Sequence, residues 1–335
     1  MRARSVLAFA ALTIITGMVV AQQEQAPMGS DPAGGNPATT QSACPRSGTL
    51  RHETVELSEG GPLATVDLIF KSGVVKQYAA ILMTGALKED EPPEWGKDLL
   101  DDGFMLVAFT VAHPPDPDPK RRPEWLFFDQ RFAHGYILGT KRAPTDAGRV
   151  IDYLISRGDV HPRKIGWFGV SSTGIPGLAV ATQEPRLAAV LGFVTTGSLR
   201  QWFETWHTNG LWKGSTPDLW PETEELLKEY DPIRHVDGLF PTAVLLVCGG
   251  DDEVVDPSTT QAFVDAARPH YESAPSRLRF VIYQGCGHNL PRDIVKMYAE
   301  HWFRLYMHPA HPPPEPTESE RKKRQPTPSD TSRSP

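Results

Sequence analysis

The amino-acid sequence predicts an α/β protein with a mostly parallel, doubly wound sheet and a small lid insertion. Short, largely apolar runs at 79–83, 104–109, 165–168, 188–193, 243–247 and 278–283 are typical of strands buried on both faces. Helical patterns separate several of these runs, and alternating strands and helices build a parallel sheet covered on both sides. Between residues 195 and 236 the alternation stops and tryptophans gather, which indicates an insertion over the sheet.

The remaining elements follow from local patterns. Alternating runs at 54–57 and 64–70, with turns at 59–62 and 72–73, predict antiparallel strands at one edge of the sheet. Apolar residues at helical spacing and flanking glycines predict helices, and the proline-rich run 113–119 predicts a rigid loop. The expected helices are 95–102, 145–157, 258–267 and 292–306.

Composition narrows the classes of function. The chain has 335 residues, of which 39% are hydrophobic and 22% charged, enough for one sizeable core in one or two domains. A net charge of −7 without a long basic run in the globular part argues against nucleic-acid binding. Cys44, Cys248 and Cys286 are too scattered for a disulfide framework or a zinc site. No metal-ligand spacing and no glycine-rich phosphate loop is present, so we expect no metal and no cofactor.

The two ends of the chain differ from the middle. Arg2 and Arg4 precede an apolar run at 6–20, which predicts a signal peptide over 1–21 and export to the periplasm or the medium. An uncleaved N-terminal anchor is the alternative; after cleavage no stable membrane association is expected. Residues 22–48 are expected to be a disordered linker and 308–335 a disordered tail, which leaves a domain at 49–307 with its lid at 195–236.

The stretch 164–177, KIGWFGVSSTGIPG, predicts a strand that turns sharply into a helix. At such a turn a serine projects from the end of the sheet, and the helix N-terminus offers a backbone N–H to a developing oxyanion. We favour Ser171 as the nucleophile because Gly169 stands two residues before it; Ser172 is the alternative. Thr173 stands where this motif usually has a glycine, which predicts a weakened or inactive site. A simple cap-and-turn cluster would have the same composition.

Two further strand ends carry the partners that a serine nucleophile needs. Asp252 follows the strand 243–247, and His288 follows the strand 278–283 between glycines and an asparagine. Histidine can accept the serine proton at neutral pH, and a carboxylate can orient the imidazole and stabilise its charged form. Asp256 is expected to cap the next helix instead.

Other residues are assigned to the surroundings of this site. The backbone N–H groups of Ser172 and of Ala86 or Leu87 are the candidate oxyanion donors, and the loss of one such donor typically costs about 3 kcal/mol of barrier. Trp202 and Trp206 lie four residues apart, on one face if the segment is helical. Their indoles could stack on a sugar or aromatic substrate, or fill a small core of the lid.

The motifs together resemble the α/β-hydrolase superfamily, across roughly 54–306. The resemblance rests on the stretch 136–198, which includes YILGTKRAPTDAGRVIDYLISRGDVHPRKIGWFGVSSTG, and on YDPIRHVDGLFPTAVLLVCGGDDEVV and YQGCGHNLPRD. Within the superfamily, the sequence most resembles the dienelactone-hydrolase and acetyl-xylan-esterase-like branches. This resemblance implies the α/β-hydrolase fold and a catalytic triad of Ser171, Asp252 and His288.

We therefore expect an exported serine hydrolase that cleaves a small-molecule or carbohydrate ester through an acyl-enzyme. A peptidase or amidase is a second reading, because prolyl-oligopeptidase relatives share the order of the triad. Those relatives usually carry a propeller that this chain is too short to hold. A non-catalytic binding protein with this fold is the third reading, and Thr173 is its main support.

Overall fold

The computed structural model describes residues 48–88, 91–113, 129–212 and 218–310. The expected signal peptide at 1–21, the expected linker up to residue 47 and the expected tail from residue 311 lie outside the described residues. So does the expected proline-rich loop after His113.

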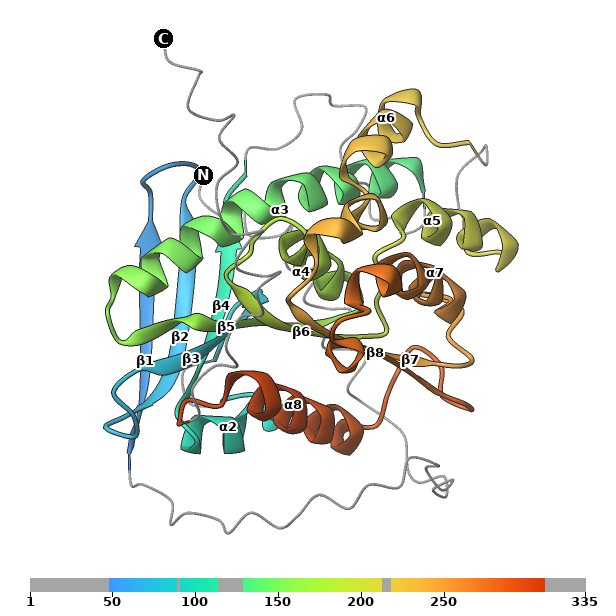
Figure 1. Ribbon diagram of the computed structural model, residues 1–335. Coiled ribbons are helices and arrows are strands. Elements are labelled where there is room, and N and C mark those ends of the chain that lie inside the picture. Colours follow the sequence, from blue (N-terminus) through green and yellow to red (C-terminus); the bar gives the residue numbers. More distant parts are fainter. Residues whose placement is uncertain (1–47, 89–90, 114–128, 213–217, 311–335) are drawn as a thin grey trace.

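An eight-stranded sheet organises the molecule, in the order β1-β2-β4-β3-β5-β6-β7-β8 (Figure 1). Strands β3 to β8 run parallel to one another, which confirms the doubly wound α/β class. The antiparallel pairs β1·β2 and β2·β4 form the predicted edge. The strands are β1 Thr49–Leu57, β2 Ala64–Ser72, β3 Tyr78–Thr84, β4 Phe104–Val111, β5 Val160–Val170, β6 Leu187–Phe193, β7 Ala243–Gly249 and β8 Leu278–Tyr283.

Helices cover both faces of the sheet. Helices α3 (Gln130–Ser156), α4 (Gly174–Ala181) and α7 (Pro257–Ala267) lie on one face, and α2 (Lys97–Asp101) and α8 (Arg292–Met307) lie on the other (Figure 1). Successive strand residues therefore enter different cores: Val107 packs in the cluster that includes Leu154 of α3, and Leu106 in the cluster that includes Phe303 of α8. Burial on both faces explains why the central strands are apolar throughout.

Helix α3 is longer than the sequence indicates. It begins at Gln130, where the Asp129 side chain accepts a hydrogen bond from the Phe132 N–H, whereas the pattern predicts a start at Thr145. Pro144 lies inside the helix and leaves one carbonyl of the preceding turn without its usual N–H partner. A proline in this position normally indicates the start of a helix, so the N-terminal half is hidden from pattern analysis.

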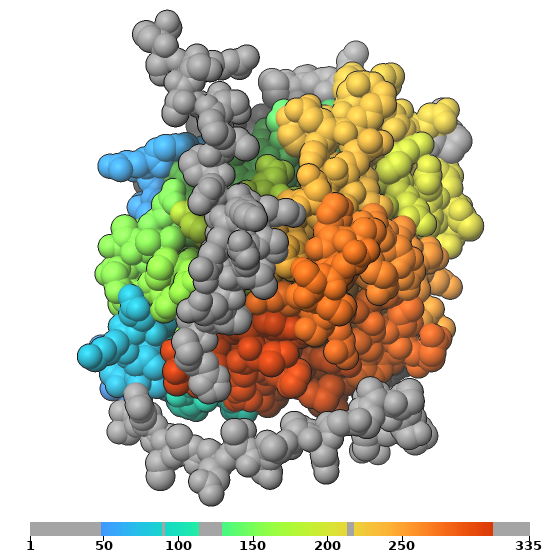
Figure 2. Space-filling view, viewed as in Figure 1, coloured from blue at the N-terminus to red at the C-terminus, as the bar shows by residue number. Residues whose placement is uncertain are grey.

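The insertion forms a small helical layer beside α7 on the surface (Figures 1 and 2). It contains α5 (Leu199–Thr208), α6 (Pro221–Tyr230) and the 3-10 segment η4 (Pro232–Gly238). Asp231 ties these parts together, because its two carboxylate oxygens accept hydrogen bonds from the N–H groups of Leu199 and Arg200 at the start of α5. Shorter 3-10 turns are η1 Glu94–Gly96, η3 Ser171–Thr173, η5 Arg268–Tyr271 and η6 Pro275–Arg277.

The chain stays in contact with the sheet after the last helix. The buried ammonium of Lys164, in β5, donates hydrogen bonds to the carbonyls of His308 and Pro309 at 2.8 and 3.0 Å. These two residues therefore pack with the domain, although the sequence assigns them to the tail. Within the described ranges, none of the helices combines the length and the apolar character that crossing a membrane requires.

Candidate active site

The turn after β5 has the geometry that a projecting serine requires. Ser171 adopts φ of +53°, a left-handed conformation that a non-glycine residue rarely holds, directly between β5 and α4. A Cβ at Gly169 would lie 2.4 Å from the Gly174 Cα, so the glycines two residues before and three residues after Ser171 allow the turn to close. This geometry favours Ser171 over Ser172 as the projecting residue.

Thr173 fits this turn. Its hydroxyl accepts a hydrogen bond from the Val170 N–H and donates one to the Val170 carbonyl, each at 2.8 Å. These bonds add a side-chain acceptor for the Val170 N–H and a side-chain donor for the Val170 carbonyl at the end of β5. The turn therefore accommodates Thr173 through these two bonds.

The structure brings Ser171, His288 and Asp252 together at the carboxyl ends of β5, β8 and β7. The Ser171 Oγ lies 2.9 Å from the His288 Nε2, and the His288 Nδ1 lies 2.9 and 3.0 Å from the two Asp252 oxygens. With the proton on Nδ1, the imidazole donates to Asp252 and can accept the hydrogen of the Ser171 hydroxyl. This arrangement can activate a hydroxyl for attack on a carbonyl carbon.

Asp252 is held in place by its own loop. Its carboxylate is fully buried, and its Oδ1 also accepts hydrogen bonds from the N–H groups of Val254 and Val255, each at 2.9 Å. These bonds fix the carboxylate and compensate for the loss of its hydration. Asp256 caps α7 by accepting from the Ser258 N–H, as the sequence predicts.

The loop after β3 narrows the choice of the second oxyanion donor. The Leu87 N–H donates to the Asp67 carboxylate at 3.3 Å, and the Gly85 N–H donates to the Phe109 carbonyl at 3.0 Å. Gly85 has φ of +120°, a conformation that glycine adopts without strain. Of Ala86 and Leu87, the two candidates from the sequence, Ala86 is the one whose N–H has no acceptor in the described part of the chain.

The structure does not support substrate contacts for Trp202 and Trp206. Both indoles are almost fully buried, and they pack against each other and against Phe203 in the cluster between the insertion and helices α3 and α4. The Trp202 Nε1 also donates to the Val254 carbonyl at 2.7 Å. Since neither ring offers a face to a ligand, their assignment as substrate-binding residues is corrected to packing within the lid.

Two residues that the sequence analysis did not single out contact the elbow. Thr195, which follows β6, donates from its hydroxyl to the Ser171 carbonyl at 2.8 Å, and Tyr136 of α3 donates to the Ser172 carbonyl. Pro176 is a signal for the second contact, because a proline four residues after Ser172 removes the helical partner of that carbonyl. No sequence pattern indicates which side chain replaces it.

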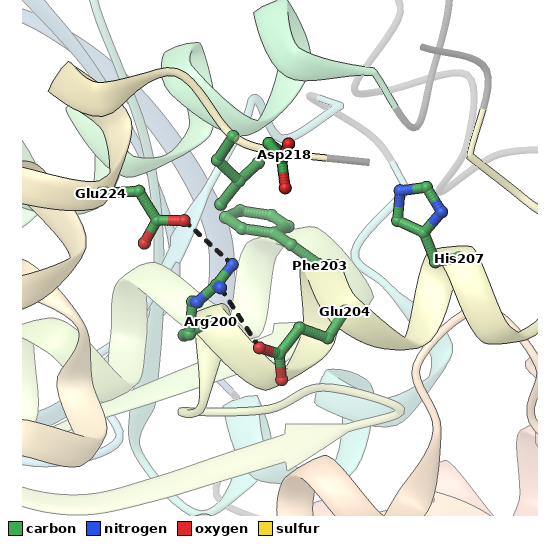
Figure 3. Close-up of a pocket in the computed structure, with 7 residues that line it drawn as sticks. Arg200, Phe203, Glu204, His207, Asp218 and Glu224 are labelled. Carbon is green, nitrogen blue, oxygen red and sulfur yellow. Dashed lines mark ion pairs between the residues drawn. The ribbon is translucent and has the colours of Figure 1, made fainter. Parts of the chain in front are cut away.

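A cavity of about 170 Å³ lies in the insertion, between α5 and α6, and is lined by none of the residues assigned to the site (Figure 3). Arg200 points at Glu204 and Glu224 there and pairs with them at 3.3 and 3.1 Å. We assign this cavity to the packing of the lid helices.

The described residues offer no other obvious reactive centre. Cys248 is buried beside Thr260, and burial raises the pKa of its thiol to about 12, which keeps it protonated at neutral pH. Cys286 is a partly exposed free thiol, and Cys44 lies outside the described residues. No group of three or more histidine, cysteine or acidic side chains in this part of the chain could hold a metal ion.

Comparison with known proteins extends this picture. The Bacillus subtilis (strain 168) protein YitV, named as a candidate esterase, is 24% identical over 213 residues, which cover 62% of this chain and 81% of YitV. Among solved structures, a prolyl endopeptidase is similar with a TM-score of 0.59 and 18% identity, over 77% of this chain and 38% of that one. TT1662 from Thermus thermophilus is similar with a TM-score of 0.51 and 20% identity, over 76% of this chain and 98% of its own.

The similarity to these two solved structures shows that they share the fold of this chain. The chain spans little more than a third of the prolyl endopeptidase. The model of the prolyl oligopeptidase family matches residues 130–306, more than half of the chain and the part that includes Ser171, Asp252 and His288. The chain therefore belongs to the prolyl oligopeptidase family of serine hydrolases, within the α/β-hydrolase superfamily.

Proposed function

We propose that this chain is an exported serine hydrolase that cleaves a carboxylic ester through an acyl-enzyme on Ser171. The observation that carries the proposal is the continuous hydrogen-bonded series from the Ser171 Oγ through the His288 imidazole to the buried Asp252. Ser171 also adopts a strained left-handed conformation, as Val194 does, and such conformations are common at functional sites.

Each residue has one task in this reaction. The Ser171 Oγ attacks the ester carbonyl carbon while its proton moves to the His288 Nε2, and the N–H groups of Ser172 and Ala86 stabilise the oxyanion. His288 then gives the proton to the departing alcohol. A water molecule then gives a proton to His288 as it attacks the acyl group, and His288 returns that proton to the Ser171 Oγ as the carboxylic acid leaves. Asp252 stabilises the imidazolium in both steps.

An ester is our first choice of substrate. YitV, the curated relative of which this chain covers four fifths, is named for esterase activity. Small acyl esters, including acetyl groups on carbohydrates, are the substrates that the sequence resemblance favours. A serine hydrolase of this kind requires no cofactor, metal or macromolecular partner.

Cleavage of a peptide or amide bond is the second candidate function. It is supported by the family itself and by the prolyl endopeptidase that shares the fold. The same triad can serve both reactions, because an amide differs mainly in its need for protonation of the leaving nitrogen by the histidine.

Hydrolysis of p-nitrophenyl acetate, butyrate and octanoate by the full chain, beside the p-nitroanilides of proline and alanine dipeptides, tests the proposal. We expect turnover of the short esters, a loss of about a thousandfold or more in Ser171→Ala, and activity within about tenfold of wild type in Ser172→Ala. Mass spectrometry of the same preparation, expressed with its first 21 residues in a bacterial host, is expected to show a chain that begins at Gln22.

Several outcomes would contradict the proposal. Faster cleavage of the anilides than of every ester would favour the peptidase function. If Ser172→Ala were inactive and Ser171→Ala active, the nucleophile would be Ser172 and not Ser171. A folded wild-type protein that neither hydrolyses any substrate nor reacts with a fluorophosphonate would indicate a binding protein, and a retained leader would contradict cleavage of the signal.

A further inference from the structure

We propose that Tyr136 and Thr195 are positioning residues that together hold the oxyanion-binding peptide of Ser172 in place. Each donates a hydrogen bond from its hydroxyl to one of the two carbonyls that flank the Ser172 N–H: Thr195 to the Ser171 carbonyl and Tyr136 to the Ser172 carbonyl. The inference rests on the proposed function, since it assigns these residues a role in the same reaction.

Thr195 acts on the peptide unit that carries the donor. The Ser171 carbonyl and the Ser172 N–H belong to one planar trans peptide, so a bond that fixes the carbonyl also fixes the direction of the N–H. The Thr195 hydroxyl lies 2.8 Å from that carbonyl and is fully buried, and its own carbonyl accepts a hydrogen bond from the Thr260 hydroxyl at 2.7 Å. The strained conformation of Ser171 requires such external support.

Tyr136 completes the other side of Ser172. Ser172 lies in the 3-10 turn η3, directly before α4 begins at Gly174. If α-helical hydrogen bonding continued back over this turn, the Ser172 carbonyl would accept from the N–H of residue 176, but residue 176 is a proline and has none. The Tyr136 hydroxyl donates to this carbonyl instead. Burial raises the pKa of the Tyr136 phenol above its ordinary value, so the hydroxyl keeps its proton throughout the neutral range.

Tyr136 is itself held by aromatic neighbours. Its ring stacks on Phe132 of the same helix at 5.5 Å and meets the edge of Trp202 of the lid helix α5 at 5.3 Å. Trp202 in turn donates to the Val254 carbonyl, in the loop whose N–H groups hold Asp252. One lid residue therefore supports both the elbow and the loop of the acid, which gives the buried Trp202 a structural purpose.

Steady-state kinetics of the full chain with p-nitrophenyl acetate test the inference. Tyr136→Phe and Thr195→Val remove only the hydroxyl contacts, and we expect each to lower kcat by about tenfold while KM stays within about twofold. Thr195→Ser keeps the donor and is expected to retain most of kcat. Tyr153→Phe, on the same helix but near its other end, is the matched control and is expected to match wild type.

A second substitution distinguishes positioning from general damage. Pro176→Ala supplies an N–H four residues after Ser172, so in the Tyr136→Phe background it is expected to restore kcat to within about threefold of wild type. Thermal unfolding of each variant shows whether it is folded. If Thr195→Val does not fold, the inference is tested by comparing the kcat of Tyr136→Phe with that of the Tyr136→Phe, Pro176→Ala double variant.

The outcomes separate this inference from the proposed function. An active wild type with an unchanged kcat in Tyr136→Phe and Thr195→Val would overturn the inference alone, as would a loss in Tyr136→Phe that Pro176→Ala does not restore. A wild type without hydrolysis or fluorophosphonate labelling would overturn both. A fall in kcat with constant KM in the single variants, and recovery in the double variant, would support the positioning role of Tyr136 and Thr195.

Discussion

Single residues at the elbow meet two different requirements, one for space and one for hydrogen bonds. Gly169 supplies space, because a Cβ there would collide with the Gly174 backbone. Thr173 supplies hydrogen bonds, because its hydroxyl pairs with both the N–H and the carbonyl of Val170. A threonine in place of the usual glycine is therefore a different way to close the same turn, and its removal is expected to weaken the turn.

Thr173→Val is expected to lower the free energy of unfolding by about 1–2 kcal/mol, because it keeps the volume but removes the acceptor of the Val170 N–H and one donor to the Val170 carbonyl. Thr173→Ser keeps the hydroxyl and is the control, with an expected loss below about 0.5 kcal/mol. Chemical denaturation of both variants measures this. Equal stability of the valine variant and wild type would contradict the role assigned to the hydroxyl.

The site residues differ in how visible they are in the sequence. Ser171, Asp252 and His288 each follow an apolar run, and the carboxyl ends of parallel strands meet at one edge of the sheet, so their proximity can be predicted. Tyr136 and Thr195 act through the backbone of the elbow, and no residue type is specific to that task. Trp202 shows the converse: an aromatic pair at helical spacing is compatible with both a ligand platform and a core, and only packing decides.

Among the elements, the lid depends on a hydrogen-bonded connection between its first helix, α5, and Asp231, which follows its second helix, α6. Helix α5 starts without a capping side chain of its own, and Asp231, after α6, accepts from the N–H groups of Leu199 and Arg200 instead. Burial raises the pKa of Asp231, which shows that its charge is costly, while these hydrogen bonds compensate part of the cost. The cap therefore couples the start and the end of the lid.

Asp231→Ala is expected to lower the free energy of unfolding by about 1–2 kcal/mol, since it leaves two N–H groups of α5 unpaired. Asp231→Asn keeps one acceptor and is expected to lose about half as much. Limited proteolysis should cut the alanine variant in the lid first, because a weakened helix terminus opens locally. Proteolysis that begins outside 195–236, or an asparagine variant less stable than the alanine variant, would argue against this cap.

The helices and strands could be predicted where the spacing of apolar residues matches the element that forms. The buried strands are apolar on both faces and are confirmed, as is the antiparallel edge of β1 and β2. The first half of α3 was not, because Pro144 mimics a helix start and the true N-cap at Asp129 lies far upstream. A proline that the surrounding packing tolerates cannot be told from a helix boundary by spacing alone.

At the scale of the whole molecule, the site lies at the carboxyl ends of the strands, and the contact that holds the end of α8 to the sheet lies toward their amino ends. Ser171 follows the carboxyl end of β5, whereas Lys164 lies toward its start and binds the carbonyls of His308 and Pro309. Burial lowers the pKa of Lys164. The folded state therefore binds fewer protons than the unfolded state as pH rises toward the ordinary lysine value of 10.5, and stability gains in that range.

Substitution of Lys164 is therefore expected to change stability and leave catalysis intact. Lys164→Ala should lower the free energy of unfolding by about 1–3 kcal/mol through lost hydrogen bonds and a cavity, and Lys164→Met, which keeps the buried stem, by less. Because methionine does not titrate, wild type should gain stability relative to Lys164→Met between pH 7 and pH 9.5. Denaturation curves at both pH values, with kcat at pH 7, measure this. A kcat that falls together with stability would contradict the separation and show that Lys164 and the site at the far end of β5 are coupled.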